Sequence, residues 1–254
     1  MERAARPGSA GSVRRGYGPG VDLLICEEML LLALDEDKGS TTWLTGWTAL
    51  SGGVLVDAIE AAAVAVRDDR LYPGSEPEHP LLGRVRAAVA ARPDLTLTEW
   101  LHRLPAEVDP FLEAVAERLV ERGVLTEQHT TIMGIFPTTR FPAADPQPER
   151  ELRARLRSIL VEGVEPDPHD QLLIALVEPA GLLSTAVEDD DRAVRRDARR
   201  RGAELAGRPA APAGPGAAVD AVAAAGRGSA VAAMMGAVAA TTAVTYSSTD
   251  TPDR

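Results

Sequence analysis

The stretch Phe111–Arg157, FLEAVAERLVERGVLTEQHTTIMGIFPTTRFPAADPQPERELRARLR, decides the fold of this chain. Its first half carries apolar residues at helical spacing, including Val115 and Leu119, which predicts a helix with one buried face. Gly123 follows the last periodic residue, where glycine commonly ends a helix. The segment therefore begins with an amphipathic helix of about three turns.

The second half of the stretch turns back on itself. A short apolar strand is expected at Val124-Leu125 and a hairpin at Thr130–Phe136. Prolines at 142, 146 and 148 hold the chain extended until a helix resumes over Glu149–Val161. This order of elements predicts a mostly α fold, in which a single compact helical domain carries a projecting β-hairpin.

Helices are expected along the rest of the chain as well. Apolar periodicity predicts them over residues 22–34, 46–66, 80–91, 98–103, 167–177, 179–187 and 189–205. Asp22 and Asp109 are the expected N-caps of the first helix and of the helix that starts at Pro110, and Thr96 or Thr98 is the expected N-cap of the 98–103 helix. Aspartate is suited to this role because its side chain accepts hydrogen bonds from the free N–H groups of a first turn.

The domain is expected to span residues 21–244. Residues 1–20, rich in Gly, Ser and Arg, and residues 245–254 predict disordered tails. Residues 207–216 are a Pro/Ala/Gly segment, which predicts a flexible linker inside the domain. The Ala-rich segment 217–244 predicts two short buried helices, because alanine is barely apolar enough to drive membrane insertion.

The composition is typical of a soluble globular protein, with 45% hydrophobic and 26% charged residues and a mean hydropathy of −0.08. The net charge of −11 is unevenly spread, since residues 1–20 carry +3 and residues 21–205 carry −14. A body this acidic repels nucleic acid at long range, although a local basic face could bind an anionic surface. The single cysteine, Cys26, excludes an internal disulfide and fits a reducing, cytoplasmic location.

The histidines do not indicate a metal site. They are His79, His102, His129 and His169. No two of them lie at metal-ligand spacing, so we expect neither a metal nor a cofactor. His79 and His169 neighbour prolines, which predicts that they lie on surface loops.

No arrangement of carboxylates or small residues indicates catalysis either. Glu27 and Glu28 are adjacent and diverge around a helix, which favours a solvated face or a charge at the start of a helix. Ser51-Gly52-Gly53 lies inside an apolar helical pattern, which favours close packing over a phosphate-binding loop. Cys26 lies in an apolar run and is expected to be buried and inert. We therefore expect no enzymatic activity.

Two groups of arginines are candidate lipid-binding residues. The larger group lies at offsets of three, four, seven and eight on the 189–205 helix: Arg192, Arg195, Arg196, Arg199 and Arg200. The smaller group lies on the 149–161 helix: Arg150, Arg153 and Arg157. Such stripes can be solvated faces whose ion pairs have little energetic weight. Alternatively they contact anionic headgroups, where each basic residue contributes about 1 kcal/mol.

The expected hairpin is the second candidate contact surface. Its tip carries four large apolar residues around Gly134, namely Ile132, Met133, Ile135 and Phe136. Large apolar side chains at a turn are costly in water. They could pack on the parent domain, pair with another protomer in a homo-oligomer, or insert into a bilayer interface.

Several segments together resemble the Golgi phosphoprotein 3 family of phosphatidylinositol 4-phosphate effectors, in particular its bacterial members. The matching segments are EEMLLLALDEDKGS, ALSGGVLVDAIEAA, HPLLGRVRAAV, TEWLHRL, ERLVERGVL, FPTTRFPAADPQPERELRARLRSIL, DQLLIALVEPAGLL and AVAAMMGAVAATTAV. Together they cover about residues 21–244. The resemblance implies one mostly helical domain with a projecting hairpin, matched at Thr130–Thr138, and a non-enzymatic protein at the cytoplasmic face of a membrane.

The resemblance also implies a lipid-phosphate pocket formed by a tryptophan, an arginine and two further basic residues. In this chain the tryptophan falls beside Trp43 and the arginine on Ser51, while the basic positions fall near Asp109 and Leu112. Each missing charge-assisted hydrogen bond removes roughly 1.5–3 kcal/mol. Specific phosphoinositide recognition is therefore expected to be degraded.

The leading hypothesis is a peripheral membrane adaptor that binds anionic phospholipid through the arginine stripes and the hairpin. The main alternative is a soluble cytoplasmic scaffold or oligomer that uses the hairpin for protein contacts. A winged-helix DNA binder is a further alternative, since a helix, Gly123 and a hairpin also describe a wing. Its recognition helix, Pro110–Arg122, would face phosphates with net negative charge.

Overall fold

The computed structural model describes residues 23–35, 39–40, 47–132, 136–188 and 191–208. The described helices are α1 Ile25–Ala33, α2 Trp47–Glu60, α3 Pro80–Ala91, α4 Leu97–Glu107, α5 Phe111–Glu121, α6 Gln147–Arg157, η1 Ser158–Glu162, α7 Pro168–Val177, η2 Leu182–Val187 and α8 Arg192–Ala206. The described strands are β1 Val64–Arg67, β2 Arg70–Pro73, β3 Gln128–Ile132 and β4 Phe136–Arg140. The mostly α fold with a β-hairpin is confirmed.

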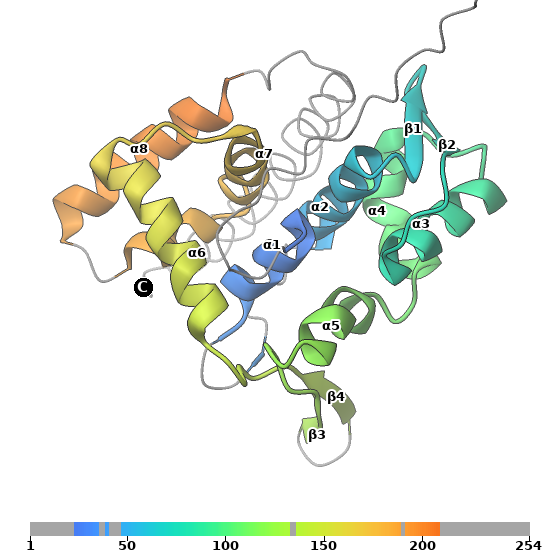
Figure 1. Cartoon of the computed structure of the whole chain (residues 1–254), viewed down its shortest axis with the longest axis horizontal. Coiled ribbons are helices and arrows are strands. Elements are labelled where there is room, and N and C mark those ends of the chain that lie inside the picture. Colours follow the sequence, from blue (N-terminus) through green and yellow to red (C-terminus); the bar gives the residue numbers. More distant parts are fainter. Residues whose placement is uncertain (1–22, 36–38, 41–46, 133–135, 189–190, 209–254) are drawn as a thin grey trace, which may run out of the picture.

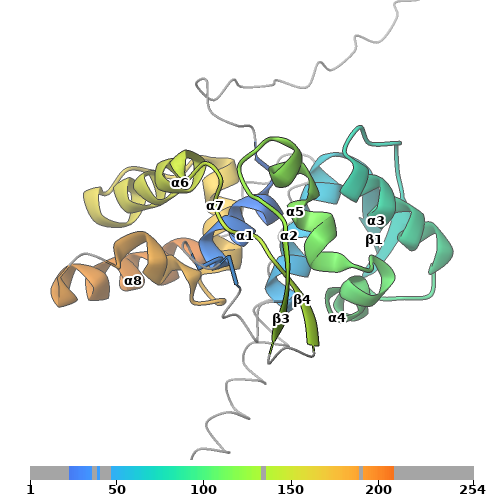
Figure 2. The ribbon, with the colours of Figure 1, turned by 90° about the horizontal axis from the view of Figure 1, so that it is seen from below.

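Helices α1 and α2 form the centre of the molecule, and two groups of elements flank them (Figures 1 and 2). We call β1, β2 and α3–α5 the first lobe, and α6–α8 with η1 and η2 the second lobe. Each of the strand pairs β1–β2 and β3–β4 is an antiparallel two-stranded sheet. The hairpin β3–β4 projects from the body next to α5 in both views.

The packing of α1 against α2 explains the small residues of α2. A Cβ atom added at Gly53 would lie 2.8 Å from Met29 Sδ and 3.3 Å from Cys26 Cα, so any larger residue would force Met29 or the backbone of α1 to move. Gly52 faces Leu176 in the same way, at 3.3 Å from Cδ2. The close packing predicted for this pair is confirmed. All nine residues of α1 are buried, including Cys26.

Several helices begin or end at the proline, threonine or glycine residues that the sequence predicted for these positions. Helix α3 begins at Pro80, a favoured first-turn position for proline, and ends at Ala91. Helix α4 is capped by Thr96, whose hydroxyl accepts from the Glu99 N–H while the Glu99 carboxylate accepts from the Thr96 N–H. Gly123 follows α5 with φ +71°, a conformation that favours glycine.

Other helix ends differ from the prediction. Helix α2 ends at Glu60 and not at residue 66, because the chain turns into β1 there. Asp109 does not cap α5, whose N-cap residue is Pro110 without a side-chain hydrogen bond. Asp22 lies outside the described residues, and the N-cap of α1 is Leu24.

Three expected elements take other forms. Instead of a strand at Val124-Leu125, the described residues show one isolated bridge between Leu125 and Ala143. The 149–161 helix is α6 followed by one π-helical turn, η1, which ends at Gly163 with φ +83°. The 179–187 segment forms the 3₁₀ helix η2.

Candidate functional site

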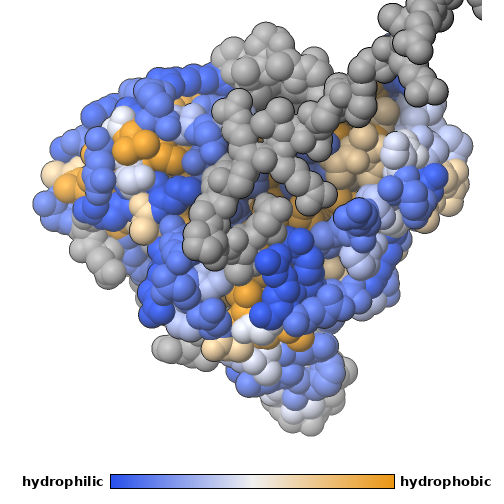
Figure 3. Space-filling model, in the orientation of Figure 1, coloured by the Kyte–Doolittle hydropathy of each residue, from blue (hydrophilic) through white to orange (hydrophobic). Residues whose placement is uncertain are grey.

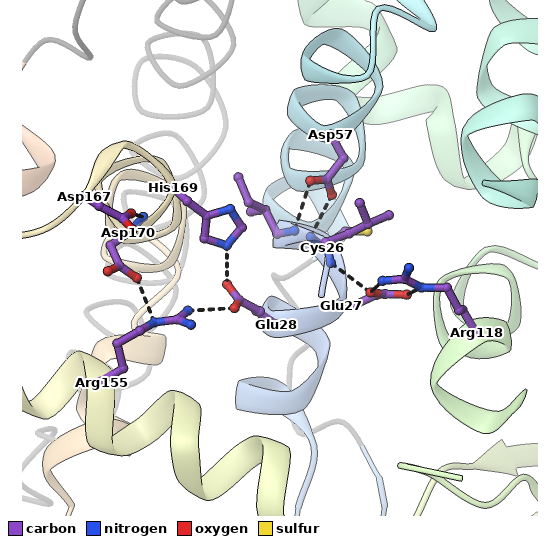
Figure 4. A network of polar contacts seen from close by, with 11 residues as sticks. Cys26, Glu27, Glu28, Asp57, Arg118, Arg155, Asp167, His169 and Asp170 are labelled. Atoms are coloured by element: carbon purple, nitrogen blue, oxygen red, sulfur yellow. Dashed lines mark hydrogen bonds and ion pairs between the residues drawn. The ribbon is translucent and has the colours of Figure 1, made fainter. Parts of the chain in front are cut away.

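Helix α1 carries two adjacent buried carboxylates that reach into different lobes (Figure 4). Glu27 is 0% exposed and receives two hydrogen bonds from Arg118 of α5, at 2.8 Å from Nε and 2.6 Å from Nη2. The Leu24 N–H donates to the same carboxylate at 2.8 Å. Burial would raise the pKa of Glu27, but the contacts with His79 and Arg118 lower it below its usual value. Glu27 therefore joins α1 to the first lobe.

Glu28 makes the corresponding connection to the second lobe. It lies 2.6 Å from Arg155 Nη2 of α6 and 2.8 Å from His169 Nε2 of α7. Arg155 also forms an ion pair with Asp170 at 2.8 Å. Burial would lower the pKa of His169, but the hydrogen bond with Glu28 and the charges of Glu28 and Asp57 raise it to about 9. His169 is thus held as a cation between carboxylates.

The N-terminus of α1 is capped by a side chain from another helix. Asp57 of α2 accepts hydrogen bonds from the Ile25 and Cys26 N–H groups at 3.0 and 2.9 Å. Desolvation raises the pKa of Asp57 to about 7, against the effect of these bonds. Burial also raises the pKa of the Cys26 thiol well above its usual value, which makes this cysteine a poor nucleophile.

Two predictions about charged residues are wrong. The solvated face expected for Glu27 and Glu28 is wrong, because both are buried and arginines from both lobes neutralise them. The alternative, a charge at the start of a helix, agrees with their position in the first turn of α1. His79 and His169 were expected on surface loops, yet their side chains are only 13% and 24% exposed and face these carboxylates. The proline beside each histidine begins a helix, α3 or α7, and not a loop.

The arginine stripe of α8 lies on the second lobe. Asp191 caps this helix through bonds to the Ala193 and Val194 N–H groups. Arg192, Arg196 and Arg199 are exposed at relative positions 0, 4 and 7, on one side of the helix, and have no ion pair with the residues that the structure describes.

The other predicted arginines make local contacts. Arg195 donates to the Glu188 carbonyl at 3.0 Å, and Arg200 pairs with Asp197 at 2.7 Å. On α6, Arg150 bonds to Gln147 at 3.1 Å, while Arg153 and Arg157 pair with Glu149 and Glu162 at 2.5 and 3.1 Å. Ion pairs therefore offset the charges of Arg153, Arg157 and Arg200, whereas Arg150 and Arg195 bond to neutral oxygens. Among the described residues, Arg192, Arg196 and Arg199 are three exposed arginines on one side of a single helix without an ion pair.

A groove in the first lobe contains positions that the resemblance assigned to the lipid phosphate. It has a volume of about 560 Å³ and includes Asp109 and Leu112. The tryptophan that lines it is Trp47, the first residue of α2, whereas Trp43 lies outside the described residues. Ser51 is fully buried in α2 and does not line this groove. The groove therefore presents an acid where a basic residue was implied.

The structure describes the hairpin in part. Ile132 and Phe136 pair across the end of β3 and β4, while Met133 and Ile135 lie outside the described residues. The remaining described strand residues are mostly polar, as in the Gln128–Thr131 segment. The role of the four apolar tip residues stays a prediction.

Sequence reasoning missed the residues that join the lobes. Arg118 and Arg155 lie 91 and 127 positions from their glutamate partners, so no local pattern pairs them. A usable signal was present at Asp57, the first acid in the segment ALSGGVLVDAIEAA, where it follows a run of eight uncharged residues. A charged side chain in a buried helix requires a hydrogen-bond or ion-pair partner from another element, so its presence predicts a contact that holds the fold together.

The described surface is mostly hydrophilic on the face seen in Figure 3, with small apolar patches between charged residues. Within the described ranges, no helix is long and apolar enough to cross a membrane.

The sequence model of Golgi phosphoprotein 3 (GPP34) matches residues 25–242 of the chain. This match extends over most of the 254 residues. The chain is a member of the Golgi phosphoprotein 3 family.

Proposed function

We propose that this protein is a non-enzymatic peripheral adaptor that binds anionic phospholipid surfaces through Arg192, Arg196 and Arg199 of α8. The observation that carries the proposal is the row of three exposed guanidinium groups that have no ion partner among the described residues. Family membership is consistent with an adaptor that lacks catalytic activity. The cytoplasmic face of a membrane is the proposed location.

The expected strength follows from the number of charges. Each arginine near an anionic surface contributes about 1 kcal/mol, so the three together favour binding by about 3 kcal/mol, or roughly 100-fold. The acidic remainder of the protein opposes this attraction, since residues 21–205 carry −14 in total. Binding should therefore require that α8 faces the membrane, and it should weaken as salt screens the charges.

Co-sedimentation with vesicles tests the proposal. The wild type should bind vesicles that contain phosphatidylserine more strongly than neutral phosphatidylcholine vesicles, and this difference should be largest at low salt. The triple variant Arg192→Gln/Arg196→Gln/Arg199→Gln should lose most of this binding.

A matched variant controls for net charge. Arg67→Gln/Arg103→Gln/Arg122→Gln removes three exposed arginines from β1, α4 and the residue after α5, all in or beside the first lobe. This variant should bind like the wild type. Equal loss in both triple variants, or no binding by the wild type at low salt, would refute the role of α8.

A homo-oligomer formed through the hairpin is the second candidate. It is favoured by the projection of β3–β4 from the body, which leaves an antiparallel pair with no third described strand beside it. Light scattering on the wild type and on a variant with residues 128–140 replaced by a short Gly/Ser linker would test it. A monomeric wild type would exclude this candidate.

DNA is not the partner that we propose. The helix that would serve as the recognition helix, α5, uses Arg118 to pair with the buried Glu27. Its exposed Glu117 pairs with Arg84 of α3. A helix whose arginine points into the protein is poorly suited to phosphate contacts.

A further inference from the structure

The groove in the first lobe is lined mainly by apolar and aromatic side chains. It lies between the start of α2, the end of α4 and the start of α5 and has a volume of about 560 Å³. The lining includes Trp47, Pro105, Phe111 and Leu112. A volume of this size lies within the range of small-molecule sites.

Trp47 gives the groove an accessible aromatic ring. It is 42% exposed, although it is the first residue of an otherwise buried helix. Its ring lies 6.0 Å from the ring of Phe111 at an angle of 54°, so Phe111 supports the indole from one side. A tryptophan ring that is accessible in a groove is suited to binding a cation, which is attracted by the electron-rich face of the ring.

Among the described residues that line the groove, two are carboxylates and one is a histidine, His102. Asp109 and Glu113 line it, and neither has an ion pair with the residues that the structure describes. A neighbouring groove of about 380 Å³ shares Glu113, but there the carboxylate of Glu117 is paired with Arg84. The first turn of α5 offsets part of the charge of Asp109 and Glu113, because a helix N-terminus is partly positive.

We propose that this groove is a binding site for a small organic cation that carries a quaternary or primary ammonium group. The indole of Trp47 attracts the cation through its ring face, Asp109 and Glu113 supply the counter-charge, and Leu112 and Pro105 contact the alkyl groups. The site is independent of the anionic lipid contact proposed for α8, which lies on the second lobe. Because the partly positive N-terminus of α5 reduces the attraction of the two carboxylates for a cation, we expect weak binding, with a dissociation constant of about 1–30 mM.

Choline and its neutral isostere 3,3-dimethylbutan-1-ol test this site, because they share a shape and differ in charge. The protein is labelled with 5-fluorotryptophan, and the ¹⁹F signal of Trp47 is assigned with Trp47→Phe. Choline should shift this signal in a saturable way, and the isostere should bind at least about five-fold more weakly. Equal binding of the two compounds, or no shift with choline at 100 mM or so, would overturn the proposal.

Two variants locate the charges that matter. Asp109→Asn/Glu113→Gln should weaken choline binding about five-fold or more without a loss of folding, since both side chains line an open groove. Glu121→Gln/Glu127→Gln removes two carboxylates from the neighbouring groove and should leave choline binding unchanged. The opposite ranking of the two variants would refute the assignment. Vesicle binding should be retained in both, which separates this test from that of α8.

Discussion

Removal of the guanidinium group of Arg118 should expose how far the fold depends on the carboxylates of α1. Glu27 is 0% exposed, and in Arg118→Met its nearby donors among the described residues would be the Leu24 N–H at 2.8 Å and His79 Nε2 at 3.6 Å. Breaking a buried ion pair by the loss of one partner costs about 3–5 kcal/mol. Arg118 is itself 26% exposed, so water can reach the vacated space, and we expect a cost near the lower limit, about 3 kcal/mol.

Urea unfolding, followed by circular dichroism, measures this cost from the shift of the midpoint at constant slope. The double variant Glu27→Met/Arg118→Met removes both charges and should recover at least about 1.5 kcal/mol relative to Arg118→Met alone, since no unpaired charge remains. Arg84→Met is the control, because it breaks an exposed ion pair with Glu117 and should cost less than about 1 kcal/mol. If Arg118→Met costs no more than Arg84→Met, the carboxylate of Glu27 is not the connection that we describe.

Two further predictions concern the same core. The pKa of His169 is about 9 in the folded state, above its usual value of 6.5. Its pairing with Glu28 therefore stabilises the folded state fully below about pH 6.5, and this stabilisation is lost as the pH rises through about 9. Urea unfolding at several pH values should show a loss of roughly 3 kcal/mol over this window in the wild type and a nearly flat response in His169→Gln. Gly53→Ala should destabilise the fold by about 1–3 kcal/mol, because the new methyl group would lie 2.8 Å from Met29. Gly83→Ala in α3 is the matched control: its methyl group meets nothing within 4 Å and should stabilise the fold by up to about 1 kcal/mol. Thermal unfolding of the two variants compares these effects directly.

The sequence was informative wherever a local contact ends an element. Pro80 begins α3, Thr96 caps α4 and Gly123 follows α5. Pro80 and Gly123 act through their own backbone conformation and Thr96 through hydrogen bonds to Glu99, three residues away. The prediction failed where a distant residue supplies the contact. Helix α1 is capped by Asp57, 32 and 31 positions from the N–H groups it accepts, and no pattern near residue 22 could reveal that.

The same distinction applies to the candidate sites. The α8 stripe was found from spacing alone, because positions 0, 4 and 7 of a helix lie on one side whatever surrounds it. Spacing did not tell which arginines are paired, since Arg195 is held by the Glu188 carbonyl in the turn before α8. On α6, the predicted stripe omitted Arg155, whose side chain points to the α1 carboxylates and has a structural role.

The two proposed binding surfaces are fixed relative to each other by α1. Arg118 belongs to α5, the helix whose first turn lines the Trp47 groove, and it is held by Glu27. Glu28 holds Arg155 of α6, in the lobe that carries α8. Because the two carboxylates are adjacent on one buried helix, neither lobe can rotate about α1 without breaking a buried ion pair, which costs about 3–5 kcal/mol. Docking of α8 on a membrane would therefore also fix the orientation of the groove, a geometry suited to an adaptor that must present a second ligand at a defined angle to the bilayer.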